Sequence, residues 1–197
     1  MNTPTPPRVL LASTSRYRAE SLRRLLADFE QAKPDVDEIP LEGESPAARA
    51  ERLAIAKAVA GAVGQANTLV IGSDQVAALD GNLLHKPGSV ARACAQLAAC
   101  SGRVVVFHTA VCLVDTHSGH QAAAVDHTQV RFRTLSAVEI ERYVAREQPL
   151  DCAGSFKCEG LGISLFERVD SSDPTALIGL PLIALAQLLR AAGVPLP

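Results

Sequence analysis

Hydrophobic positions along the chain follow two periodicities, which predict strands separated by helices. Short apolar runs rich in β-branched residues are typical of buried strands, and apolar residues three or four positions apart are typical of helices. The runs predict strands at residues 8–12, 69–71, 76–79, 83–84, 104–114, 122–133 and 163–166. Helical spacing predicts helices that begin after residues 15, 45, 89 and 136 and near residue 180. This order, with one antiparallel hairpin region, indicates an α/β fold with a mixed, twisted sheet flanked by helices.

A buried apolar run near the middle of the chain leads directly into three polar residues, Ser-Asp-Gln. The run at residues 69–71 is expected to form a strand that ends at Gly72. Open α/β sheets bind ligands at the ends of buried strands, so Asp74 is a candidate for chemistry. The alternative is that the amides of a turn satisfy its carboxylate. Asp80-Gly81 then predicts a tight hairpin.

The first predicted strand is followed by a segment of serines and arginines that leads into a helix. Residues 13–18 read Ser-Thr-Ser-Arg-Tyr-Arg. A helix N-terminus offers unpaired N–H groups and a partial positive charge, so this segment is a candidate phosphate cradle. The alternative is that Ser15 only caps the helix and the arginines are solvated. The segment lacks glycine and is therefore not a P-loop.

Two further charged features are candidates for the same site. Residues 35–38 carry three acids in four positions, which indicates either a solvated loop or ligands for a hard divalent cation. Lys57 lies four residues after Leu53 and shares the inward face of its predicted helix. A lysine in that position either extends its amine to solvent or points into a cleft.

Length and charge narrow the class of protein. The chain has 197 residues, so we expect one domain over residues 1–197, with residues 1–7 as a flexible proline-rich tail. The formal net charge is −2, which gives no basic field for nucleic acid, so an anionic substrate needs a few local cations. No apolar run is long enough to span a bilayer and no signal peptide is recognisable, so we expect a cytoplasmic protein without a membrane partner.

The five cysteines do not form a recognisable disulfide or metal framework. Their number is odd, they contain no Cys-x-x-Cys motif, and no Cys/His cluster has the spacing of a zinc site. We therefore expect reduced thiols, most of them buried.

Six short motifs follow one another along the chain with characteristic separations. They are Ala12-Ser13-Thr14-Ser15-x-x-Arg18, Val36-Asp37-Glu38, Leu53-Ala54-x-Ala56-Lys57-Ala58, Gly72-Ser73-Asp74, Lys86-Pro87 and Ala153-Gly154-Ser155-Phe156. From about residue 9 to residue 192 this order resembles the Maf family of nucleoside triphosphate pyrophosphatases. The resemblance implies a Maf/ITPase-like fold in two lobes with a deep cleft, often as a homodimer. It also implies a divalent metal and release of pyrophosphate from a nucleotide.

The resemblance also implies roles for individual residues. Asp74 matches the catalytic acidic residue of the family. Glu38 and Asp74 match a site for Mg²⁺ or Mn²⁺. The positions that match the phosphate-binding residues are Ser13, Arg18, Lys57 and Lys86.

Three departures from the common family pattern point to one branch. Tyr17 stands where the pattern has arginine, Gln75 where many members have threonine, and Glu159 where many have glutamine. Together they resemble the 7-methyl-GTP pyrophosphatases, for which removal of modified nucleotides is the implied role. The alternatives are a dTTP/UTP pyrophosphatase of the same family and a non-catalytic nucleotide-binding regulator of septum formation.

The chemistry of the base is consistent with this branch. 7-Methylguanine carries a positive charge, so the ring of Tyr17 is a candidate for stacking with cation–π attraction. A carboxylate such as Glu159 accepts hydrogen bonds from the N1–H and N2 amine of guanine. The alternative is that Tyr17 packs on the core and Glu159 is a surface acid.

Overall fold

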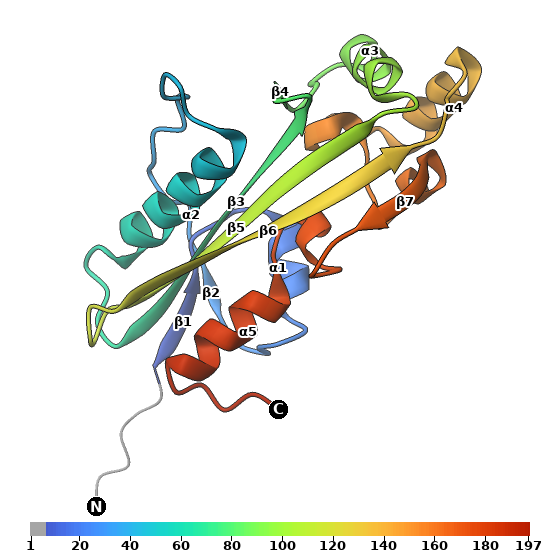
Figure 1. The fold of residues 1–197 in the computed structure, drawn as a ribbon. Helices are drawn as coiled ribbons and strands as arrows, with labels where there is room; N and C mark the ends of the chain where they lie inside the picture. Colours follow the sequence, from blue (N-terminus) through green and yellow to red (C-terminus); the bar gives the residue numbers. More distant parts are fainter. Residues whose placement is uncertain (1–6) are drawn as a thin grey trace, which may run out of the picture.

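The computed structural model describes residues 7–197 and forms one mixed sheet with helices on both faces (Figure 1). The expected N-terminal tail falls almost wholly on residues 1–6, which lie outside the described residues. The strands are β1 (Arg8–Leu11), β2 (Glu30–Gln31), β3 (Thr68–Leu79), β4 (Asn82–Leu84), β5 (Val104–Asp115), β6 (Gln121–Phe132) and β7 (Phe166–Asp170). The α-helices are α1 (Arg16–Leu22), α2 (Pro46–Ala62), α3 (Val90–Cys100), α4 (Ala137–Glu147) and α5 (Leu182–Ala191). Three 3₁₀ turns are η1 (Ala153–Ser155), η2 (Leu161–Leu165) and η3 (Ala176–Ile178).

The sheet has the order β2-β1-β3-β5-β6-β7, and β4 also pairs with β3. β1 is parallel to β2 and β3, whereas the remaining pairs are antiparallel. The mixed α/β sheet predicted from the sequence is therefore confirmed. Three strands of twelve residues, β3, β5 and β6, run side by side through the length of the molecule (Figure 1).

The two edges of β3 are paired differently. One edge pairs with β5 without interruption from Leu69 to Leu79. On the other edge, β1 pairs with residues 68–71 and β4 with residues 77–79. Residues 72–76 therefore have no strand partner on that edge within the described part of the chain. This gap in the sheet contains the Ser-Asp-Gln triplet.

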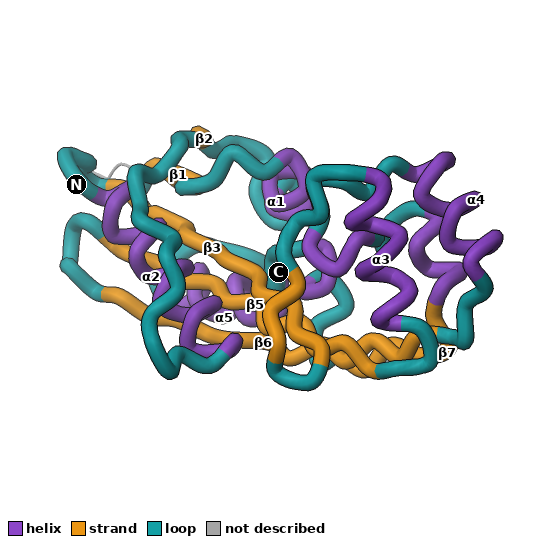
Figure 2. Tube along the Cα trace, turned by 90° about the horizontal axis from the view of Figure 1, so that it is seen from above, coloured by secondary structure: helices purple, strands orange, loops and turns teal. Residues whose placement is uncertain are grey.

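Alternate residues of β3 face opposite sides of the sheet. Leu69 and Ile71 pack into one apolar cluster with α1 and α5, and Ala77 and Leu79 pack into a second with α3 and α4. Gly72 and Val76 face α2, which approaches closely because its inner face carries the small side chains of Ala50, Ala54 and Ala58. Figure 2 shows α2 and α5 near one end of the sheet and α3 and α4 at the other, which gives the two expected lobes.

Serine caps begin four of the helices, as the sequence predicts. The side chains of Ser15, Ser45, Ser89 and Ser136 each accept a hydrogen bond from the backbone N–H three residues later. Ser136 also forms a reciprocal capping box with Glu139. The Asp80-Gly81 hairpin is confirmed too, and both residues adopt positive φ as a tight turn between β3 and β4 requires.

Two predicted boundaries are wrong. The central strand does not end at Gly72, because its pairing with β5 satisfies the backbone through the polar triplet. The strand predicted at residues 163–166 is mostly a 3₁₀ turn, and β7 begins at Phe166. A Cβ atom on Gly162 would lie 2.4 Å from the carbonyl oxygen of Lys157, so the chain turns tightly there instead of extending.

All five cysteines are free, as expected from their spacing, but only Cys100 and Cys112 are buried, so the expectation that most of them are buried is wrong. Among residues 7–197, no helix combines the length and apolar character that a membrane span requires.

The contact between α2 and β3 depends on Gly72. A Cβ atom at this position would lie 2.2 Å from the carbonyl oxygen of Ala54 and 2.4 Å from the amide nitrogen of Ala58. Both atoms belong to the backbone of α2, so they cannot move aside as a flexible side chain would. The helix can therefore lie against the strand only where the side chain is absent.

We expect Gly72→Ala to lower the free energy of unfolding by about 3 kcal/mol or more, because the helix must move away from the sheet. Urea denaturation measures the change. Gly64→Ala is the matched control, since Gly64 has φ +73° and nothing within 4 Å of an added Cβ. It should lose only about 1 kcal/mol from the backbone conformation. Equal losses in the two variants would contradict this account of the α2–β3 contact.

Candidate active site

A cleft of about 1010 Å³ opens at the gap in the edge of β3. Its walls come from the segment after β1, the inner face of α2, the hairpin after β3, and the loops before and after β7. All nine candidate residues from the sequence line it: Ser13, Tyr17, Arg18, Glu38, Lys57, Asp74, Gln75, Lys86 and Glu159. The deep cleft expected between two lobes is therefore present, and the candidate residues share it.

Asp74 and Lys57 form a buried ion pair in the cleft. Asp74 projects from β3 toward α2, and the Nζ of Lys57 donates to its Oδ1 at 2.6 Å. The same ammonium lies 2.7 Å from Oε1 of Glu38. Lys57 is only 7% exposed and Asp74 only 8%. Lys57 thus points into the cleft, and Asp74 is paired with a cation and not with turn amides alone.

Glu38 lies at the outer side of this pair. Its side chain is more than half exposed, although it reaches the buried ammonium of Lys57. Partial burial raises the pKa of Glu38, but the hydrogen bond and charge of Lys57, together with Lys86 and Arg18, outweigh this and hold the pKa below its usual value. Glu38 therefore presents an ionised carboxylate next to Asp74.

The carboxylates of Glu38 and Asp74 have the chemistry of a magnesium or manganese site. No group of three His, Cys, Asp or Glu side chains suited to a metal occurs within residues 7–197. Mg²⁺ in nucleotide enzymes is commonly held by one or two carboxylates, with substrate phosphates and water as the other ligands. Glu38 and Asp74 converge on the Nζ of Lys57 and match that smaller set, so the two residues fit the divalent cation expected from the sequence.

Arg18 and Ser13 form the wall next to this charge cluster. Nη1 of Arg18 donates to Oγ of Ser13 at 3.3 Å, and its Nε donates to the carbonyl oxygen of Gly179 at 2.9 Å. Burial lowers the pKa of Arg18, and the charges of Asp74 and Glu38 oppose that shift. The two hydrogen bonds hold the guanidinium in one orientation, and Arg18 lines the same cleft as Lys57.

Gln75 lies on the opposite face of β3 from Asp74. Its Nε2 donates to Oγ1 of Thr109 at 3.0 Å and to the carbonyl oxygens of Ala176 and Leu177 at 3.0 and 3.2 Å. Gln75 therefore ties β3 to η3, which supplies another wall of the cleft.

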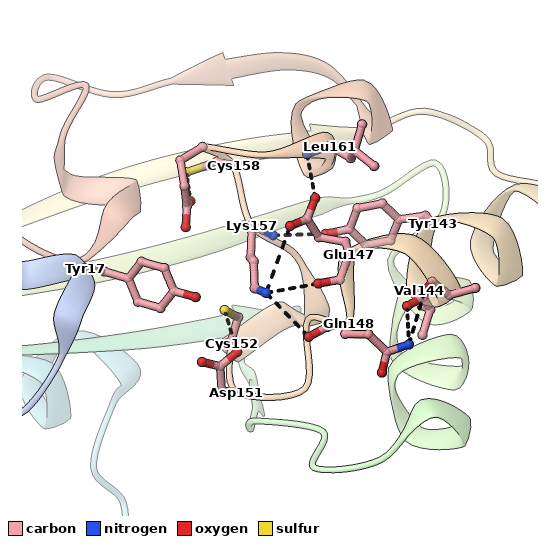
Figure 3. A network of polar contacts seen from close by, with 12 residues as sticks. Tyr17, Tyr143, Val144, Glu147, Gln148, Asp151, Cys152, Lys157, Cys158 and Leu161 are labelled. Atoms are coloured by element: carbon pink, nitrogen blue, oxygen red, sulfur yellow. Dashed lines mark hydrogen bonds and ion pairs between the residues drawn. The ribbon is translucent and has the colours of Figure 1, made fainter. Parts of the chain in front are cut away.

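Tyr17 carries a planar cation on its ring. The guanidinium carbon of Arg16 lies 4.7 Å from the ring centroid, and Nη2 of Arg16 donates to the hydroxyl at 2.7 Å. Figure 3 shows Tyr17 facing the loop that bears Cys152 and Cys158. Partial burial raises the pKa of Tyr17. The ring thus accepts a flat, positively charged group in this structure.

The loop opposite Tyr17 contributes Glu159 and two thiols to the cleft. Glu159 is exposed, and its Oε2 accepts from Sγ of Cys158 at 3.4 Å. Burial raises the pKa of both Cys152 and Cys158 to about 12. Both cysteines therefore remain protonated at neutral pH and are poor nucleophiles.

Arg49 also lines the cleft, although the sequence analysis does not single it out. Its Nη2 donates to the carbonyl oxygen of Glu38 at 2.6 Å. Its Nη1 is buried without a hydrogen-bond partner among the described residues. The helical spacing in the sequence is the feature that points to Arg49. Arg49, Leu53 and Lys57 are each four residues apart and therefore share one face of α2.

A family model described as "Maf-like protein" matches residues 8–192 of this chain. The chain belongs to the Maf family. It is 59% identical over 191 residues to a protein of Xanthomonas oryzae pv. oryzae named 7-methyl-GTP pyrophosphatase, covering 97% of this chain and 100% of the relative. It is 55% identical over 195 residues to a protein of that name from Burkholderia pseudomallei, covering 98% of this chain and 91% of the relative.

A solved structure also shares the fold of this Maf protein. The HAM1 protein from Coxiella burnetii matches with a TM-score of 0.50 over 94% of this chain and 99% of its own. The identity is 17%, so the likeness concerns the fold alone. It supports the Maf/ITPase-like α/β fold expected from the sequence.

Replacing Lys57 tests whether the buried ion pair stabilises this Maf protein. We expect Lys57→Met to cost about 3 kcal/mol, because it leaves the carboxylate of Asp74 buried without its cation. For a chain of this size that corresponds to a fall in Tm of about 6 to 12 °C. Lys86→Met is the matched control, since Lys86 is exposed at the rim of the cleft and should leave Tm unchanged. An unchanged Tm for Lys57→Met would refute a stabilising role for the pair.

Proposed function

We propose that this protein is a nucleoside triphosphate pyrophosphatase that hydrolyses 7-methyl-GTP to 7-methyl-GMP and pyrophosphate. The observation that carries the proposal is that one cleft contains both the Asp74–Lys57–Glu38 charge cluster and a tyrosine ring that already makes a cation–π contact. The two relatives that are more than half identical over nearly the whole chain carry that name. The charge cluster would bind the triphosphate of such a substrate, and the ring of Tyr17 would bind its base.

The proposed reaction is in-line attack of water on the α-phosphorus. Asp74 orients the water or takes its proton, which goes to Oδ1 or Oδ2 as the new P–O bond forms. The bond between the α-phosphorus and the bridging oxygen breaks, and pyrophosphate leaves. A divalent cation held by Glu38 and Asp74 would add positive charge that stabilises the phosphate oxygens in the transition state.

The cations of the cleft offset the charge that accumulates on the leaving pyrophosphate. Lys57 and Arg18 are held in place by the contacts described above, and Lys86 is at the rim. Arg49 joins this set in our proposal because its buried Nη1 is a donor that an anion in the cleft can satisfy. Ser13 contributes by holding Arg18 in direction.

The base lies between Tyr17 and Glu159 in this proposal. A methylated guanine is flat and positively charged, like the guanidinium of Arg16 that the ring of Tyr17 already accepts. It would displace Arg16 from the ring, or use the opposite face. The carboxylate of Glu159 would accept from the N1–H and N2 amine. Uracil and thymine present carbonyl oxygens there and would be repelled.

One assay distinguishes this proposal from the two alternatives. Pyrophosphate release is measured for 7-methyl-GTP, GTP, UTP and dTTP, each with Mg²⁺ and with Mn²⁺. A preference for 7-methyl-GTP supports the proposal, and a preference for UTP or dTTP assigns the protein to the other branch. Tight binding without turnover of any nucleotide would indicate a regulator.

Asp74→Asn tests the reacting residue. The amide keeps the shape of the side chain but cannot accept the proton, so we expect kcat to fall at least about 100-fold. Binding of 7-methyl-GMP, measured by calorimetry, should largely survive. Glu51→Gln on the exposed side of α2 is the matched control and should retain full activity. Near-normal turnover by Asp74→Asn would exclude Asp74 as the base.

Tyr17→Ala and Tyr17→Phe test the stacking partner. We expect Tyr17→Ala to reduce kcat/KM for 7-methyl-GTP about 10-fold more than for GTP, because cation–π attraction is worth about 0.5 to 2 kcal/mol. Tyr17→Phe keeps the aromatic face and should retain the preference. Steady-state kinetics with both nucleotides measures the effect. If Tyr17→Ala loses activity on both equally, the ring does not read the methyl group.

A further inference from the structure

The loop that bears Glu159 receives little support from the sheet. It connects α4 to η2, and within residues 150–160 its regular structure is the single 3₁₀ turn η1. Its first half is anchored by Phe156, whose ring meets those of Phe107, Phe132 and Phe166 edge to face at 4.7 to 5.6 Å. Glu159 follows three residues later and is exposed. A second anchor is needed to fix its carboxylate.

Lys157 provides one half of that anchor. Its backbone N–H donates to the hydroxyl of Tyr143 at 3.0 Å, and its Nζ donates to the carbonyl oxygens of Glu147 and Gln148 at 3.0 and 3.5 Å (Figure 3). These carbonyls lie at the C-terminus of α4, where helix carbonyls lack partners and the helix dipole favours a cation. The lysine side chain thus fastens the loop to the end of α4.

Glu147 provides the other half. Its Oε2 accepts from the backbone N–H of Leu161 at 2.8 Å, and its Oε1 lies 4.0 Å from Nζ of Lys157 (Figure 3). Gly160 makes room for it, because a Cβ there would lie 2.7 Å from Oε2 of Glu147. The carboxylate therefore holds both ends of the short segment that has Glu159 near its centre.

Lys157 also closes this segment on itself. Its carbonyl oxygen accepts from the backbone N–H of Gly160 at 3.2 Å and from that of Gly162 at 3.0 Å. Residues 158–160 thus form a small loop tied to α4 at its start and its end. Neither Glu147 nor Lys157 lines the cleft, so their effect on a ligand there must pass through the loop.

We propose that Glu147 and Lys157 are positioning residues for base recognition, which hold Glu159 at a fixed place opposite Tyr17. The proposal rests on the proposed role of Glu159 as reader of the guanine edge. Two hydrogen bonds to one edge require a carboxylate held within a fraction of an ångström, and a loop that must be ordered by the ligand weakens binding. A loose loop should therefore raise KM while leaving the water-activating cluster intact.

The test is a double-mutant cycle between Glu147 and Glu159, read as kcat and KM for 7-methyl-GTP. We expect Glu147→Ala to raise KM about 10-fold and leave kcat within about 2-fold, and Glu159→Ala to raise KM at least as much. In the Glu159→Ala background, Glu147→Ala should have no further effect on KM. Glu147→Gln keeps an acceptor for Leu161 and should restore most of the wild-type KM. Glu141→Ala, on the exposed side of α4, is the matched control.

Three results would overturn the positioning role. The first is additive losses in the double variant, which would show that Glu147 acts independently of Glu159. The second is a wild-type KM in Glu147→Ala and Lys157→Met. The third is an equal fall of kcat in both, with a lowered Tm, which would show a general structural role. If wild-type protein turns over no nucleotide, the proposed function itself fails, whereas each of these three results leaves pyrophosphatase activity in place.

Discussion

The unbroken pairing of β3 with β5 is the constraint on which the cleft depends. Because β5 pairs with one edge of β3 from Leu69 to Leu79, the strand continues through residues 72–76, although no strand among residues 7–197 pairs with its other edge there. An exposed strand edge usually invites another strand. Here the cleft lies at that opening, so Asp74 and Gln75 line a cavity instead of facing a neighbouring strand.

Successive side chains of a strand point to opposite faces of the sheet, so the Ser-Asp-Gln triplet makes contacts on both faces. Asp74 faces α2 and meets Lys57, whereas Gln75 faces the other way and holds η3. A shift of register by one residue would exchange these faces and remove both interactions. Gly72 makes the first of them possible, because only a residue without a side chain lets α2 come close enough for Lys57 to reach the carboxylate.

Much of this arrangement could be predicted from local patterns in the sequence. Serine caps, the Asp-Gly hairpin and the side on which Lys57 lies are decided by neighbouring residues, so they could be read directly. The extent of the central strand could not, because the partner that carries it through Gly72 lies about forty residues away. Helical spacing places Arg49 on the same face of α2 as Lys57, but the spacing does not show its surroundings: only the folded loop of Glu38 leaves one of its nitrogens buried without a hydrogen-bond partner among residues 7–197.

The two ends of the cleft differ in what holds their side chains in place: ion pairs at the Asp74–Lys57–Glu38 cluster, and packing and hydrogen bonds at the loop of Glu159. In the absence of a ligand, Lys57 offsets the charges of Asp74 and Glu38, which would otherwise repel each other at close range. A triphosphate brings four negative charges and, with a divalent cation, a competing partner for every member of this set. Under the proposed function, the phosphate end exchanges partners on binding, whereas the loop that bears Glu159 is already held by the packing of Phe156 and by α4. Under the proposed function, discrimination between bases would depend on the fixed position of this loop, and turnover would depend on the rearrangement of the ion pairs.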